Sequence, residues 1–174
     1  MSRHVVNDVE TLKAMTHPLR LKLLGLLRAE GPATASELAR KVDESSGSTS
    51  YHLRQLERFG FVGDDVEQPS GRERRWRALH DLTSLPDSLF SLPGGRAALE
   101  QLQNRQLQQL LDGVTAWKEL ADPDGFGHSD YLLQLDPEDM QELSEELTAL
   151  VERYRSRSGT IPVKLHALLL PRTT

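Results

Sequence analysis

Helix-starting and helix-ending residues follow one another so closely between residues 17 and 60 that this stretch cannot form one long helix. His17-Pro18 starts a helix that Gly31-Pro32 ends. Thr34-Ala35-Ser36-Glu37 is a capping box and predicts the start of a short helix. Ser45 or Ser46 caps another helix, which is predicted to run to about Phe59 and to stop at Gly60. The first half of the chain is therefore predicted to be a set of short helices, the earliest over Val9 to Met15.

A basic hairpin is predicted directly after these helices. Phe61 to Val66 reads as a strand, Glu67 to Gly71 as a turn, and Arg74 to Leu79 as the returning strand. An exposed arginine cluster beside a turn suits contact with a nucleic-acid backbone or minor groove. A basic edge strand protected against aggregation is the alternative. The cluster, opposed only by Glu73, consists of Arg72, Arg74, Arg75 and Arg77.

The helix predicted from Ser46 to Phe59 has two distinct faces. One face carries Thr49, Leu53 and Leu56 and is expected to pack inward. The opposite face begins with small residues, which allow close approach to a ligand, and ends with long cations that can reach bases or phosphates. An ordinary solvated helix face is the alternative. The residues of this outer face are Gly47, Ser50, Tyr51, Arg54 and Arg58.

These motifs together resemble ArsR-like winged-helix repressors over about residues 9–79. The resemblance rests on Met15 to Leu24, Ser36 to Ala39, Ser48 to Glu57, and the wing segment Gly71 to Arg77. It implies a homodimer whose recognition helices enter successive major grooves, with Ser46, Gly47, Ser50, Tyr51 and Arg54 facing DNA.

Three features depart from the pattern of that family. Asp43 stands where glycine is common, although aspartate tolerates the left-handed conformation. Ser48-Thr49 replaces a threonine and an apolar residue. The chain has no cysteine, so metal sensing through thiolates does not carry over.

The second half of the chain is predicted to hold a long helix and a strand-helix-strand element. The long helix runs from Gly94 to about Ala121, and its apolar face would pair with a second copy or close a private core. Tyr131 to Leu135 and Ile161 to Leu170 read as strands on either side of a helix that starts at Asp136-Pro137. The residues predicted for dimerisation are Leu99, Leu102, Leu110, Val114, Trp117 and Leu120.

Charge separates the two halves. The net charge of −5 is unusual for a DNA-binding protein. The first 80 residues hold 13 Lys/Arg against 11 Asp/Glu, whereas the rest hold 8 against 15. Only the first half is therefore a plausible partner for phosphate.

Other sites are not supported by the sequence. The six histidines are scattered, and only His128-Ser129-Asp130 near Asp124 could hold a metal, against ordinary loop residues as the alternative. No pattern for catalysis is present, and no cofactor is expected. No apolar run is long enough for a membrane span or a secretion signal, so a cytoplasmic location is expected.

The predicted fold is mainly α with small β. A winged helix-turn-helix DNA-binding domain over residues 6–80 precedes a dimerisation region, with room for ligand binding, over residues 85–174. The predicted function is sequence-specific binding of double-stranded DNA as a homodimer, in the manner of a repressor on a palindromic operator. The alternative is a winged helix used for protein–protein association. The operator, the regulated genes and any small-molecule effector are left open.

Overall fold

The computed structural model describes residues 2–65, 73–119, 129, 131–155, 157, 159, 163 and 165–170. The chain divides into two compact units, residues 1–109 and residues 110–174. The chain is mainly helical with small sheets, as predicted. We describe each unit by itself.

The first two helices of the N-terminal unit, α1 (Val9–Thr16) and α2 (Pro18–Glu30), begin at side-chain caps. Asp8 accepts a hydrogen bond from the Thr11 backbone N–H at 2.8 Å. His17 Nδ1 accepts one from the Leu19 N–H at 3.2 Å, and Pro18 occupies the first turn. The predicted helix start at His17-Pro18 is confirmed.

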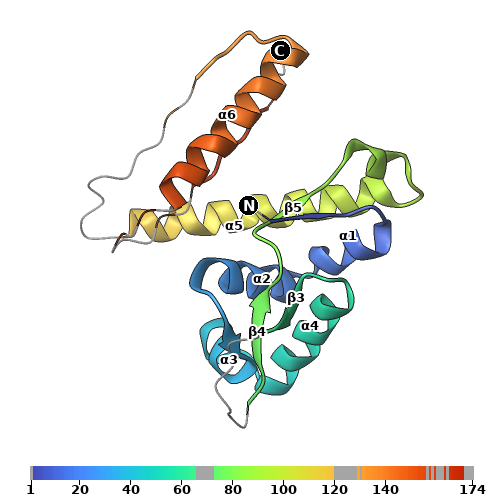
Figure 1. Ribbon diagram of the computed structural model, residues 1–174, viewed down its shortest axis with the longest axis vertical. Coiled ribbons are helices and arrows are strands. Elements are labelled where there is room, and N and C mark those ends of the chain that lie inside the picture. Colours follow the sequence, from blue (N-terminus) through green and yellow to red (C-terminus); the bar gives the residue numbers. More distant parts are fainter. Residues whose placement is uncertain are drawn as a thin grey trace. The chain divides into compact units, whose positions relative to one another are not determined.

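The next two helices, α3 (Ala35–Val42) and α4 (Ser46–Arg58), form the helix-turn-helix (Figure 1). The predicted capping box is present, because Thr34 and Glu37 each bond the other's backbone N–H. Asp43 adopts the left-handed conformation, with φ 57° and ψ 50°, and so permits the tight turn without glycine. Ser45 caps α4 by accepting from the Ser48 N–H at 3.1 Å.

A three-stranded antiparallel sheet forms the wing and lies beside α4 in Figure 1. Its order is β2 (Ala33–Thr34), β4 (Arg75–Ala78) and β3 (Val62–Asp64), with Trp76 opposite both Ala33 and Asp64. The β3 and β4 strands confirm the predicted hairpin with shorter bounds. The predicted turn, 67–71, and the adjoining Val66 and Arg72 lie outside the described residues.

A second, parallel sheet was not predicted from the sequence. It joins β1 (Arg3–Val5) to β5 (Leu82–Ser84), and a 3-10 helix, η1 (Asp87–Ser91), follows it. Arg28 of α2 bonds the His80 carbonyl at 3.0 Å and the Thr83 hydroxyl at 2.9 Å. Residues beyond the predicted wing therefore belong to the N-terminal unit.

One apolar core holds this unit together, and the first turns of α5 (Gly95–Lys118) contribute to it. Leu99 and Leu102 are 3% and 0% exposed and belong to the same core as Leu12, Leu53 and Phe61. Their side chains are buried within their own chain. For this part of the predicted dimerisation face, the private-core alternative therefore holds. Only the later residues of that face remain candidates for dimerisation.

The C-terminal unit has a different character. Its helix α6 (Pro137–Arg155) starts where the sequence predicted. The predicted strand over Tyr131–Leu135 is wrong, because these residues form no strand. The described residues of the segment 161–170 likewise form none. A strand needs a hydrogen-bonded neighbour, and apolar composition alone does not provide one.

No helix of the described residues combines the length and the apolar character needed to cross a membrane.

Candidate nucleic-acid interface

The inner face of α4 is anchored as the sequence predicted. Thr49, Leu53 and Leu56 are each 0% exposed, and both leucines belong to the core. This packing fixes the rotation of α4 about its axis, because residues spaced by three and four share one side of a helix. The opposite residues must then face away from the core.

The outer face of α4 is open to solvent. Ser46, Gly47, Tyr51, Arg54 and Arg58 are exposed, with Tyr51 at 57%, and Ser50 is half-buried. A Cβ atom at Gly47 would meet nothing closer than the Ser45 hydroxyl, at 3.9 Å. Glycine is therefore not required there by the packing of the chain itself, and the small residue leaves room for an approaching ligand.

The two arginines of this face have no hydrogen-bond or ion-pair partner among the described residues. Arg54 makes no hydrogen bond or ion pair with another described residue. Arg58 lies over the Phe59 ring, 5.6 Å from its centroid, and forms no ion pair among the described residues. A guanidinium without a carboxylate partner is suited to a phosphate or to a guanine edge.

The wing arginines behave differently, because each described one is held by its own chain. Arg74 binds Glu57 and Asp64. Arg75 donates to the Pro32 carbonyl at 2.6 Å and lies 3.6 Å from the Asp65 carboxylate. Arg77 donates to the Asp64 carbonyl at 3.1 Å. Arg72, the remaining member of the predicted cluster, lies outside the described residues.

Two histidine pairs are sites that sequence reasoning missed. His17 and His52 lie with ring centroids 4.3 Å apart, and Tyr51 packs edge-on to His52 at 5.1 Å. His4 packs on His80 at 5.1 Å and on Phe61 at 4.7 Å. Members of each pair are far apart in the sequence, so no local spacing could have revealed them.

Burial shifts the pKa of three of these histidines, His4, His17 and His52, downward. It lowers the pKa of His17 and of His52 below the ordinary value, and the neighbouring Arg20 lowers both further. Burial also lowers the pKa of His4, with His80 and Arg28 adding to the effect. No cluster of three metal-ligating side chains occurs in the described part of the chain. The one local group of possible ligands noted in the sequence, His128 and Asp130 near Asp124, lies outside the described residues.

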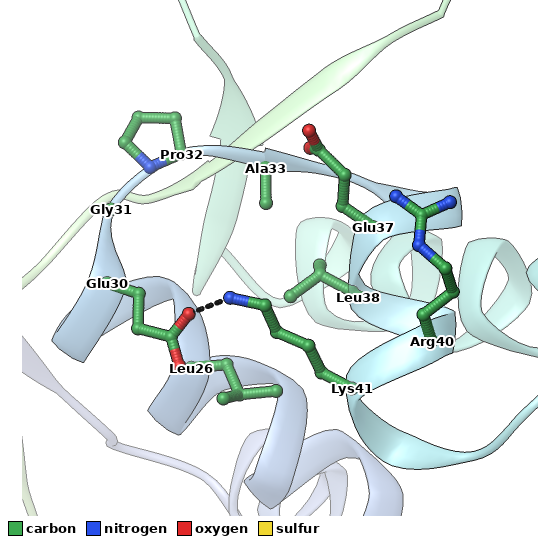
Figure 2. Close-up of a pocket in the computed structure, with 9 residues that line it drawn as sticks. All are labelled: Leu26, Glu30, Gly31, Pro32, Ala33, Glu37, Leu38, Arg40 and Lys41. Atoms are coloured by element: carbon green, nitrogen blue, oxygen red, sulfur yellow. Dashed lines mark hydrogen bonds and ion pairs between the residues drawn. The ribbon is translucent and has the colours of Figure 1, made fainter.

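A pocket of about 310 Å³ lies between the end of α2 and α3 (Figure 2). Leu26 and Leu38 line it, and Glu30 and Lys41 point toward each other across it as an ion pair. Both side chains are about half exposed, at 49% and 47%. The exposed arginines of α4 are not part of this pocket.

Comparison with known protein families gives a match that covers the helix-turn-helix. Residues 15–62 match the model described as a helix-turn-helix domain, which spans α2, α3 and α4 but less than half of the chain. The comparison with curated proteins gives no significant match.

Three solved structures illustrate the structural similarity. The YusO protein from Bacillus subtilis shares 14% identity over 82% of each chain, with a TM-score of 0.35. A transcriptional regulator homologue from Pyrococcus horikoshii shares 23% over 61% of this chain and 98% of its own, with a TM-score of 0.35. A MarR family transcriptional regulator from Silicibacter pomeroyi shares 18% over 82% and 74%, with a TM-score of 0.34. Similarity at this level adds nothing to what the matched segment and the fold establish.

The matched segment and the wing sheet define a winged helix-turn-helix domain. This is the class of module that DNA-binding transcriptional regulators use. The match is to helix-turn-helix domains in general, so the narrower resemblance to ArsR-like proteins stays a prediction.

Proposed function

We propose that this protein is a DNA-binding transcriptional regulator that inserts α4 into the major groove. The observation that supports this most strongly is the outer face of α4. It combines small residues at the start of the helix with exposed, carboxylate-free arginines, Arg54 and Arg58, further along. Small residues permit close approach, and the arginines supply donors for base edges and phosphates. Ser46, Gly47, Ser50 and Tyr51 complete the proposed contact face.

The proposal includes a homodimer on a palindromic operator, acting as a repressor. A single winged helix reads few base pairs, and coupling two copies raises affinity through effective concentration. No described residue from 110 onward is buried in the single chain, although Leu110, Val114 and Trp117 share one face of α5. A second copy would give these half-buried residues a partner. Leu120 of the predicted face lies outside the described residues.

A protein-binding winged helix is the second candidate function. It is favoured because Arg74, Arg75 and Arg77 each bond other residues of the chain. The wing is therefore less available to phosphate than the sequence suggested. The acidic net charge of −5 favours it as well. The two functions differ in one measurable property, the response of binding to salt.

Salt dependence of duplex binding tests the proposal. A genome-wide selection of bound fragments supplies the operator, and its affinity is measured by fluorescence anisotropy on the full chain. With several phosphate contacts in each subunit, the affinity should fall about a thousandfold between 50 and 200 mM salt. Binding that is indifferent to salt, or an absence of any enriched fragment, would contradict DNA reading and favour the protein-binding alternative.

A further inference from the structure

Arg74 forms the most heavily bonded side-chain cluster of the described wing. Its Nη2 donates to Glu57 Oε1 at 2.5 Å, and its Nη1 lies 3.3 Å from Glu57 Oε2. Its Nε donates to Asp64 Oδ1 at 2.5 Å. The guanidinium also lies over the Trp76 ring, 3.8 Å from the centroid. Arg74, the residue directly before β4, thus joins the last turn of α4, strand β3 and the central strand of the sheet.

These contacts occupy the hydrogen-bonding capacity that phosphate would need. A guanidinium binds a carboxylate or a phosphate through the same fork of donors, and Glu57 already takes that fork. The Nε, the remaining edge, is taken by Asp64. The cluster of one cation and two carboxylates carries a net negative charge, which repels a DNA backbone.

Glu57 explains why such a cation is needed at this place. It lies in the last turn of α4, where the helix dipole disfavours a negative side chain. Arg74 neutralises that carboxylate, and its hydrogen bonds with Asp64 and Glu57 raise the pKa of the guanidinium above its ordinary value. Trp76, only 2% exposed, gives the guanidinium a fixed aromatic face to stack on. The cluster is therefore anchored to the core at one end and to α4 at the other.

We propose that Arg74 is a positioning residue that latches the wing to the recognition helix, and that it does not contact phosphate. The latch rests on the proposed function, and it sets the wing at a defined place relative to α4 before DNA arrives. Preorganisation of this kind raises affinity because binding need not order the wing. Arg74 thereby affects DNA binding only by bonding Glu57 and Asp64, which holds the wing in place. Arg58 contacts the DNA backbone directly.

The effect of Glu57→Gln on operator affinity separates the two roles by sign. If Arg74 is a latch, Glu57→Gln weakens the fork and gives an operator affinity about threefold to tenfold below that of Glu44→Gln, which loses the same charge. If Arg74 is a phosphate contact restrained by Glu57, the same change releases it and raises affinity above that of Glu44→Gln. Glu44→Gln is the matched control: it removes one negative charge near the start of α4 without touching Arg74, and it should leave affinity unchanged or raise it.

The salt slope gives a second and independent readout. Arg74→Ala should lower operator affinity by a similar factor while the slope of log K against log salt stays as in the unaltered chain. Arg58→Ala should reduce that slope by about one for each lost contact. The double variant with Glu57→Gln should be no weaker than the worse single variant, because both remove one interaction. A reduced slope for Arg74→Ala, or an affinity of Glu57→Gln at or above that of Glu44→Gln, overturns the latch.

Fluorescence of Trp76 keeps the latch testable if the chain does not bind DNA. Trp117→Phe leaves Trp76 as the one tryptophan, since the chain has two. In that background, Arg74→Lys and Glu57→Gln should each change the Trp76 emission, whereas Arg58→Ala should not. An unchanged emission overturns the latch. Failure of the unaltered chain to bind any duplex overturns the proposed function, and the Trp76 emission then decides the latch alone.

Discussion

The two compact units of this chain differ in whether they bury their own apolar side chains. In residues 1–109, leucines from α1, α2, α4 and α5 belong to one core together with Phe61 and are almost fully covered. In residues 110–174, no described residue is buried, and Tyr131, Leu133 and Leu170 are more than half exposed. A folded unit normally derives its stability from apolar burial. The first unit closes its own core, and the exposure of the described residues of the second unit supports the proposal that it packs against a second copy.

The largest expected effect comes from charging the proposed dimer face. Leu110→Asp should separate the subunits, because an unpaired buried charge is costly, and operator affinity should then fall about a hundredfold or more. Sedimentation velocity measures the mass, and anisotropy measures the affinity. Asn104→Asp adds the same charge at an exposed position of α5 and should change neither. A Leu110→Asp chain that stays dimeric and binds normally would show that this face is not used.

The closed core of the N-terminal unit predicts a large loss of stability on truncation. Leu102→Ala removes a side chain that is 0% exposed and should lower the free energy of unfolding by about 2–5 kcal/mol. Leu111→Ala, at a residue of the same helix that is 59% exposed, should change it by less than about 0.5 kcal/mol in the monomer. Urea unfolding followed by circular dichroism compares the two. Equal losses would mean that both parts of α5 are packed alike.

A change on the α4 outer face should affect specificity and leave the fold intact. Tyr51→Ala or Arg54→Ala should reduce the preference for operator over random DNA by about 1–3 kcal/mol, because base contacts are lost. Both side chains are exposed, so the melting temperature should hardly move. Competition binding with the two DNAs measures the preference. Equal weakening on both DNAs would assign these residues to backbone contact.

The smallest expected effect concerns pH and the His17–His52 contact between α2 and α4. The folded state lowers both pKa values, so it favours the neutral rings. The stability they contribute is full above the ordinary histidine pKa of about 6.5 and is lost as the pH falls below it. The melting temperature should therefore drop between pH 7.5 and 5.5.

His17→Asn should lessen that drop, because asparagine can still cap α2 but does not titrate. The other charged groups acting on His17 are Arg20, Arg105 and Glu44, and they are unchanged in this variant. His166→Asn, at an exposed position, serves as the control and should leave the drop as it was. A drop of the same size in the His17→Asn chain would mean that other groups cause it.

Local signals in the sequence were sufficient for helices α1 to α4 of the N-terminal unit. The capping box at Thr34 and Glu37, the left-handed turn at Asp43 and the cap at Ser45 act within a few residues, so their chemistry can be read along the chain. The inward face of α4 followed from periodicity alone, since Thr49, Leu53 and Leu56 recur at helical spacing.

Tertiary structure decided what depends on partners distant in sequence. The pairing of β1 with β5 joins residues about 80 positions apart, and β2 is too short to carry any alternating pattern. The same holds for Arg74. Its basic character was visible in the sequence, but its three partners are set by the register of β3 with β4 and by the end of α4. Composition shows that a cation is present, and only the folded chain determines which carboxylates reach it, because hydrogen bonds and ion pairs require contact within a few ångströms.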